Sequence, residues 1–428
     1  MANRFQRLRL PQLSDGAARS YRQERLAQFF LPISISLMEG GFVGVIADKT
    51  FHVHPAALAL ISAAPMFGNL SSVLWARFAE GRRKVPLLVG MNLLLVALVA
   101  SVAWVPAGAL GGWLLIAALV ASRLVIGGVV TVRSVIWTVN YPADVRARVT
   151  SRLTVISSLV LIFTALAGGL ILDRDPNAFR LIYAGAAGLI LPGVLAFSRV
   201  KLAGEENRGS VAIGAESRAE DAGPLAALRI LRTDPTFARY LAWQFLLGVS
   251  NMMTEPIVLY VVSRQLAASY TVSIGLLTVV PMALAIVTIP LWAGYIDRVH
   301  ITEFRSRHSW LWAISQALTA VGAITGSLVW IGVGRSMLGV ARGGGILAWQ
   351  LGHNDFAHPE RAGLYMGLHA TLTGLRGAIA PFLGMGLFLG VAGWEGMGGF
   401  ALVACALTSG AATLGFRSLH RELSRRAG

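Results

Sequence analysis

The sequence predicts an all-α integral membrane protein with twelve transmembrane helices in two six-helix bundles. Three observations support this: the composition, the spacing of apolar stretches, and a match between the two halves. Only 14% of the 428 residues are charged, whereas soluble domains carry about a quarter. The mean hydropathy is +0.64. So few charges cannot cover a water-facing surface on a chain this long, so the apolar excess must face lipid.

The apolar stretches have the length that a bilayer requires, because a spanning helix needs about 20 mainly apolar residues. Twelve stretches meet this requirement: 25–47, 56–76, 86–106, 110–138, 152–172, 179–198, 238–262, 272–295, 309–328, 329–351, 362–390 and 394–416.

The charges lie between these stretches, and the connecting loops alternate between basic and nearly uncharged. The net charge is +16, which in a soluble protein would suggest nucleic acid. Here the positive-inside rule explains it, because basic loops remain in the cytoplasm. We therefore expect a multi-pass protein of the cell (inner or plasma) membrane with both termini cytoplasmic, in contact with lipid and not with nucleic acid.

The polar segments divide the chain into five parts. We predict a cytoplasmic N-terminal tail at 1–24, an N-terminal bundle at 25–198, a cytoplasmic linker at 199–236, a C-terminal bundle at 237–416 and a C-terminal cytoplasmic tail at 417–428. The linker is rich in Glu, Arg, Gly and Ser, which is typical of a flexible connection.

The two halves repeat landmark residues at a nearly constant offset. The offset is 212 residues for Arg123 and Arg335, 216 for Glu39 and Glu255, 216 for Pro65 and Pro281, and 217 for Trp75 and Trp292. Two parallel repeats predict two bundles around a pseudo-twofold axis along the membrane normal, with a substrate site near the midplane.

Several motifs resemble those of the major facilitator superfamily, and the resemblance in architecture covers nearly the whole chain. That family carries G-x-x-x-D-R-x-G-R-R/K after its second helix, with an echo after its eighth. The corresponding segments are WARFAEGRRK and GYIDRVHITEFR, both of which match only in part. The family's R-x-x-x-G motif of helix 4 matches Arg123 to Gly127 and recurs from Arg335 to Gly339.

The resemblance implies a cytoplasmic gate at these loops. Its residues would be Glu80, Gly81, Arg82 and Arg83 in the first loop and Asp297 and Arg298 in the second. Arginines at a helix end can cap carbonyl groups and pair with carboxylates, and such pairs can latch the bundles. Equally, these cations can serve only to set the topology.

Two carboxylates inside predicted spans are candidate proton-binding groups. Glu39 lies in the middle of the first span, and Glu255 lies in the seventh, just before Pro256. An ionisable residue inside the membrane suggests a functional site, and a carboxyl group removed from water binds a proton more readily. By resemblance, Arg123 assists ion coupling or bundle contact, and a structural Glu39–Arg123 pair is the alternative.

Further polar residues within the spans are candidate substrate contacts. Gln244 and Asn251 are seven residues apart and share one helix face. The complete set of candidate cavity residues is Gln244, Asn251, Arg335, His369 and Arg376. For each of them, a role in packing is the competing interpretation.

We therefore expect a monomeric secondary active transporter that moves a small molecule by alternating access, driven by a proton gradient. An acidic group in helix 1 favours efflux over import. No cofactor and no metal site is expected, and the sequence contains no Walker, HExxH, GxSxG or CxxC motif, so we expect no enzyme activity. The alternatives are an uncoupled facilitator and a membrane sensor or assembly protein on the same scaffold.

Overall fold

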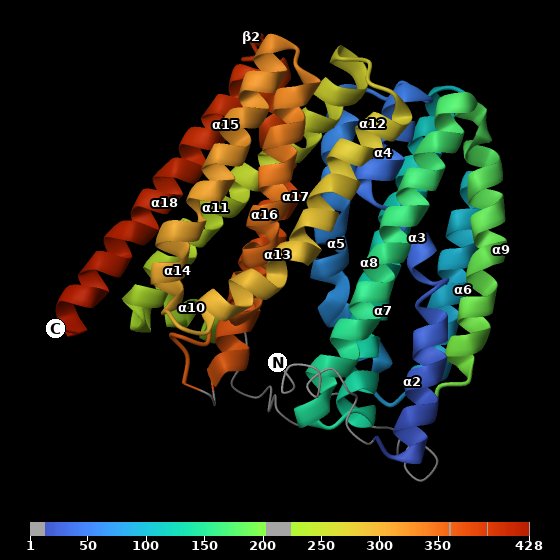
Figure 1. Cartoon of the computed structure of the whole chain (residues 1–428), viewed down its shortest axis with the longest axis horizontal. Coiled ribbons are helices and arrows are strands. Elements are labelled where there is room, and N and C mark those ends of the chain that lie inside the picture. The colour runs from blue at the N-terminus through green and yellow to red at the C-terminus, as the bar shows by residue number, and fades with distance from the viewer. Residues whose placement is uncertain (1–12, 203–223, 359–360, 392, 428) are drawn as a thin grey trace, which may run out of the picture. The chain divides into compact units, whose positions relative to one another are not determined.

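The computed structural model describes residues 13–202, 224–358, 361–391 and 393–427 (Figure 1). Residues 1–12 of the predicted N-terminal tail, residues 203–223 of the predicted linker and residue 428 lie outside the described residues. The elements are α2 (Asp15–Ala27), α3 (Pro32–Leu37), α4 (Gly40–Lys49), α5 (Pro55–Ala79), α6 (Lys84–Val102), α7 (Ala109–Asn140), α8 (Ala143–Arg174), η1 (Pro176–Ala178), α9 (Phe179–Ser198), α10 (Pro224–Thr233), α11 (Pro235–Tyr260), η2 (Val261–Gln265), α12 (Tyr270–Ile274), η3 (Gly275–Val279), α13 (Val280–Ile296), α14 (Ile301–His308), α15 (Trp310–Thr325), α16 (Leu328–Leu351), α17 (Ala362–Leu389), β1 (Gly390–Val391), β2 (Trp394–Glu395) and α18 (Phe400–Ala427).

Among the described residues, nine helices are long and apolar enough to cross a membrane, or ten if the bent first pair is one span. Two other predicted spans correspond to α15, which has only 16 residues, and α16, which carries Arg335 and Arg342. Large apolar side chains are exposed on many spans, including Val73, Leu74, Leu181, Val287 and Leu407, which are 61% to 76% exposed. The predicted all-α membrane architecture is confirmed, and these side chains face the lipid.

The chain forms two compact units. The first comprises Met1–Glu39 and Phe67–Ala215, and the second comprises Gly40–Met66 and Glu216–Gly428. Helix α5 therefore contributes its first part to the second unit and its remainder to the first. The bundle bounds 25–198 and 237–416 stay a prediction, and residues 40–66 are where this division differs from them.

The first unit packs α6 against α7 and α9, and α3 against α8. Its first helix, α2, begins at Asp15, and the Ser14 side chain caps it by accepting a hydrogen bond from the Ala17 amide at 3.4 Å. Residues 15–24 are thus helical, although the sequence placed them in the N-terminal tail. The sequence did not predict this helix because it is polar, and even its buried side includes the carboxylate of Glu24.

The first predicted span, 25–47, is broken rather than continuous. Helix α3 ends at Leu37 and α4 begins at Gly40. The bend between the segments Asp15–Leu37 and Gly40–Lys49 is 41°. Gly40 and Gly41 follow the break directly, and glycine is among the weakest helix formers. The break places Glu39 at a point where the helix hydrogen-bond ladder is interrupted.

In the second unit α11 packs against α17 and α18, and α15 packs against α16 and α18. These long helices are visible in Figure 1 in yellow-green, orange and red. Helix α11 continues through Pro256 to Tyr260 and then passes into the π-helix η2. Pro256 therefore lies inside α11 and does not end it.

The end of the second unit differs slightly from the predicted spans. Helix α17 ends at Leu389, and the strands β1 and β2 pair antiparallel before α18 begins at Phe400. Helix α18 then continues to Ala427. The predicted tail at 417–428 is therefore an extension of the last helix over its described residues.

Candidate functional site

Glu39 and Arg123 form an ion pair within the first unit. Arg123 Nη2 donates to Glu39 Oε2 at 2.6 Å. Arg123 is buried near the middle of α7, whereas the Glu39 side chain is 36% exposed. Among the described residues, Arg123 is the one cation within ion-pair distance of this carboxylate. The pair joins a long, continuous helix to the break in the first span.

Close backbone contact between α5 and α7 positions Arg123. A Cβ atom added to Gly68 would meet the carbonyl oxygen of Arg123, and one added to Gly127 would meet the carbonyl of Gly68. Small residues allow helices in membranes to approach in this way. This contact explains physically why glycine follows Arg123 by four residues.

Glu255 lies between two arginines in the second unit. Arg335 Nη2 donates to Glu255 Oε2 at 3.1 Å, and Arg342 Nη2 donates to Glu255 Oε1 at 2.6 Å. Arg335 also donates to the carbonyl oxygens of Leu276 and Leu277 at 3.1 and 2.9 Å. These carbonyls belong to the π-helix η3, a type of distortion that is common at functional sites.

The residues that repeat in the sequence thus make the same kinds of contact in both units. In both units a carboxylate of the first predicted span pairs with the arginine of the R-x-x-x-G motif. Trp75 Nε1 donates to the Leu124 carbonyl at 2.8 Å, and Trp292 Nε1 donates to the Val340 carbonyl at 2.9 Å. Each tryptophan therefore ties its own helix to the helix that carries the arginine.

Three of the candidate cavity residues lie together in the second unit. Arg376 Nη1 donates to the main-chain carbonyl of Gln244, and the Arg376 guanidinium lies where a Cβ on Gly248 would project. His369 lies seven residues before Arg376 on α17 and therefore on the same helix face, and the centre of its ring lies 5.5 Å from that of Trp349. The structure therefore gathers Gln244, His369 and Arg376 into one buried group.

This group is cationic and incompletely satisfied. Within the described residues, Gln244 Oε1, His369 Nε2 and Arg376 Nε have no hydrogen-bond partner. Arg305, which is 2% exposed, lies close enough to act electrostatically on both His369 and Arg376. No described carboxylate forms an ion pair with either arginine. Because unpaired buried charge is costly, this group favours a ligand or water that accepts hydrogen bonds.

The other two candidate cavity residues have protein partners. Asn251 Oδ1 accepts from Gln316 Nε2 at 2.7 Å, next to a network in which the Ser250 hydroxyl contacts Gln316, Ser409 and the Cys405 carbonyl. Arg335 is held by Glu255 and the η3 carbonyls, as described above. The structure thus places neither of them with Gln244, His369 and Arg376.

The candidate gate residues lie at exposed helix ends. Glu80, Gly81, Arg82 and Arg83 form the turn between α5 and α6, and Asp297 and Arg298 follow α13. Gly81 has a φ of +67°, a backbone conformation that residues with a side chain rarely adopt. The Arg82 guanidinium lies 3.9 Å from the centre of the Phe78 ring. Their role as a gate stays a prediction.

Lys84 follows this turn as the first residue of α6, and the sequence analysis gave it no role. It is fully buried, and its Nζ donates to the carbonyl oxygens of Ala79 and Arg82 at 2.9 and 2.8 Å. It thus caps the end of α5 with a cation, which the helix dipole favours. Its position directly after a basic turn could have suggested this role.

The sequence analysis also missed a buried network around Glu24. Glu24 accepts hydrogen bonds from Trp137 Nε1 at 2.7 Å and from the Tyr141 hydroxyl at 2.8 Å, and Arg133 lies 3.5 Å from it. Burial and the charge of Glu24 raise the pKa of the Tyr141 hydroxyl. The 109-residue separation of Glu24 and Arg133 left no local sequence signal.

A second missed network surrounds Asp48 in the second unit. The Asp48 carboxylate is 1% exposed and contacts both the Ser263 hydroxyl and the Arg264 guanidinium. Next to it, Lys49 Nζ donates to the Ala268 carbonyl at 2.8 Å. These contacts attach α4 to η2 and to the segment that follows it. The adjacent opposite charges of Asp48 and Lys49 were the only signal in the sequence.

The described residues contain no group of three or more His, Cys, Asp or Glu side chains that could hold a metal ion.

Comparison with known proteins places this geometry in a family. A model described as Major Facilitator Superfamily matches residues 26–299, whereas no curated protein matches the chain. Similar solved structures include the nucleoside transporter NupG, with 14% identity, a TM-score of 0.70, and coverage of 94% of this chain and 99% of that chain. A D-xylose–proton symporter has 13% identity, a TM-score of 0.67, and coverage of 94% and 97%. A bacterial homologue of the human lysosomal transporter Spinster has 13% identity, a TM-score of 0.65, and coverage of 96% and 98%.

At these identities the solved structures establish the fold, and the family match covers more than half of the chain. The protein is accordingly a membrane transport protein rather than an enzyme, and it belongs to the Major Facilitator Superfamily.

Proposed function

We propose that this chain is a proton-coupled secondary transporter that exports a small molecule by alternating access. The observation that carries the proposal is the Glu39–Arg123 pair at the break in the first span. A carboxylate with one cationic partner can lose that partner when it binds a proton. Occupancy by a proton then changes both the local charge and the contact between two helices.

The coupling step follows from the charges. In the ionised state Glu39 and Arg123 neutralise each other and hold the α3–α4 break against α7. Protonation removes the negative charge, so the guanidinium is left without its counter-charge. An uncompensated buried charge is strongly unfavourable, and the helices can relieve it by moving so that Arg123 reaches water or the substrate. The proton thereby biases one conformation over the other.

The substrate is proposed to contact Gln244, His369 and Arg376. Because this group and the neighbouring Arg305 are cationic and lack a carboxylate partner, it suits a neutral or anionic molecule with hydrogen-bond acceptors. Exchange of such a molecule for an inward-moving proton gives export. Energy comes from the ion gradient, with no cofactor.

The proposed topology places both termini in the cytoplasm and the protein in the inner or plasma membrane, as a monomer. The basic turn of Arg82, Arg83 and Lys84 between α5 and α6, and the arginines at the end of α18, support this orientation.

The test begins with a thermal-shift screen of the purified protein against solute libraries at two pH values. A ligand of the folded state raises the melting temperature. The best solute is then loaded with the protein into liposomes under an imposed pH gradient. We expect its movement against its own gradient, and a protonophore should abolish that movement.

The two alternatives have distinct outcomes in the same experiment. A solute that equilibrates across the liposome membrane without accumulating would identify an uncoupled facilitator. A solute that binds but does not cross in either direction would favour a sensor or assembly protein on this scaffold.

A further inference from the structure

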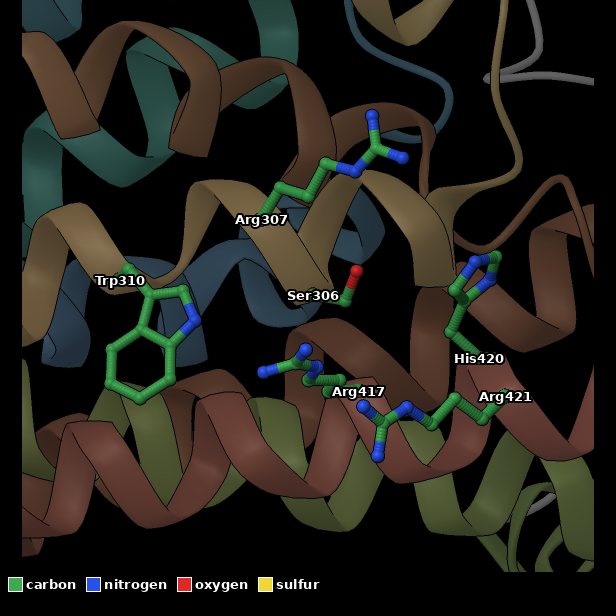
Figure 2. Close-up of a pocket in the computed structure, with 6 residues that line it drawn as sticks. All are labelled: Ser306, Arg307, Trp310, Arg417, His420 and Arg421. Carbon is green, nitrogen blue, oxygen red and sulfur yellow. The ribbon is translucent and has the colours of Figure 1, made fainter.

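A basic hollow in the second unit is lined by none of Gln244, His369 and Arg376. Its volume is about 430 Å³, and it is lined by Ser306 and Arg307 of α14, Trp310 of α15, and Arg417, His420 and Arg421 of α18. Figure 2 shows the helices that bring these side chains together, with Trp310 at one end and His420 at the other. The helices α14 and α15 each pack against α18, so the hollow is built on one rigid corner of this unit.

The cations on the α18 side of the hollow have no protein counter-charge. Arg417 and Arg421 are four residues apart and therefore project from the same helix face. Among the described residues, neither of them forms an ion pair or a hydrogen bond. Like charges at this spacing repel each other, so an anion between them would be stabilising.

Three other arginines near this end of the unit have carboxylate partners. Arg307 pairs with Glu303 at 3.0 Å and donates to the Tyr295 hydroxyl at 3.1 Å. Further along α18, Glu422 pairs with both Arg239 and Arg426 at 2.6 and 2.7 Å. Among the arginines that line the hollow, Arg307 has a carboxylate partner in the described residues, whereas Arg417 and Arg421 have none.

The hollow lies at the end of an apolar, lipid-facing stripe. On α18, Leu407, Leu414 and Arg421 are spaced by seven residues and share a face, and the two leucines are 70% and 54% exposed. On α15 the half-exposed Trp310 is followed at helical spacing by Ile314 and Val321, each 42% exposed. Tryptophan is enriched where the hydrocarbon core meets the headgroups. The same two helices therefore offer cations at one end and an acyl-facing surface along their length.

We propose that this hollow binds the phosphate of an anionic phospholipid headgroup, with the acyl chains along the α15–α18 stripe. Arg417 and Arg421 hold the phosphate, because guanidinium groups bind phosphate in a bidentate manner. Trp310 lies at the level of the lipid glycerol. A free phosphate has the same charge but would make no use of the apolar stripe, which is the reason to favour a lipid. The site is separate from the proposed coupling pair and does not depend on it.

The experiment measures lipid retention by the purified full-length protein. The protein in detergent is mixed with phosphatidylglycerol or phosphatidylcholine, and bound lipids are counted by native mass spectrometry while thermal unfolding is followed in parallel. We expect one phosphatidylglycerol molecule to be held about tenfold more tightly than phosphatidylcholine, since anionic headgroups gain about this much from paired arginines near a membrane surface.

The variant Arg417→Gln with Arg421→Gln should lose this preference. The matched control, Arg425→Gln with Arg426→Gln, removes the same charge from the same helix and should retain it within about twofold. If both variants lose the preference equally, diffuse charge explains the binding and the proposal is overturned. If the double variant does not fold, Arg421→Lys takes its place and should weaken the preference, because lysine cannot bind the phosphate in a bidentate manner.

Inorganic phosphate and glycerol 3-phosphate are tested at the same concentrations. We expect neither to raise the melting temperature as phosphatidylglycerol does. Equal stabilisation by a soluble phosphate would show that the hollow takes a free anion and would reject the lipid. Equal retention of phosphatidylglycerol and phosphatidylcholine, whose phosphate is balanced by its own choline cation, would overturn the proposed selectivity for an anionic headgroup.

Discussion

In the first unit Glu39 has one guanidinium partner, Arg123, whereas in the second unit Glu255 has two, Arg335 and Arg342. The exposures of the two carboxylates are similar, at 36% and 30%. The difference is in the number of cations and in the backbone contacts. Arg335 is additionally anchored to two carbonyls of η3, while no described backbone group accepts a hydrogen bond from Arg123.

The comparison indicates how duplicated elements can take different roles. Two guanidinium groups contact the Glu255 carboxylate, and one of them is also held by backbone carbonyls. Glu39 has a single ion-pair partner among the described residues. The second unit therefore has the more extensively bonded version of the pairing, and the switching role that we propose belongs to the first unit, where fewer contacts must break.

The largest expected difference concerns coupling. Glu39→Gln should reduce accumulation driven by a pH gradient to the level of protein-free liposomes, because the amide cannot exchange a proton. Glu255→Gln should leave the dependence on the gradient in place, although it weakens the protein. The measurement is uptake of the screened solute with and without the gradient. Loss of coupling in Glu255→Gln and its survival in Glu39→Gln would reverse the roles assigned to the two units.

A smaller difference is expected in stability. Arg335→Gln should destabilise the protein by about 3–5 kcal/mol, as is typical when one partner of a buried ion pair is removed. Arg123→Gln should cost less, about 1–3 kcal/mol, because it removes a single charge-assisted hydrogen bond. Thermal unfolding in one detergent at one pH compares them. Equal losses would mean that the η3 contacts add nothing to the second unit.

The smallest expected effect concerns the tryptophan contact that the two units share. Trp75→Phe and Trp292→Phe each remove one indole hydrogen bond to a carbonyl and keep most of the ring. Each should therefore destabilise the protein by about 1 kcal/mol. The same unfolding measurement applies, with Trp104→Phe as control, since that side chain is 73% exposed. A much larger loss at one position would show that the repeat does not extend to this contact.

The sequence predicted the pairing of Glu39 with Arg123 correctly, although the two residues are 84 positions apart. The prediction was possible because a charge inside a spanning helix requires a partner, and few charges were available. Arg342 as a second partner of Glu255 was not predicted, because the repeated landmarks offered one arginine for each carboxylate. The networks of Glu24 and Asp48 were missed because each carboxylate lies at a predicted span boundary, where burial is not visible in the sequence.

By itself the sequence determined the all-α membrane architecture, the approximate position of each span and the duplication of its landmarks. These follow from composition and periodicity, since a bilayer requires long apolar helices whose backbone groups are satisfied internally. The tertiary structure alone decided that the first span breaks at Glu39, that Glu255 has two arginine partners, and that Arg417 and Arg421 have no ion-pair partner in the described part of the chain. Those outcomes depend on distances between helices remote in sequence, and packing and electrostatics fix such distances only once the chain is folded.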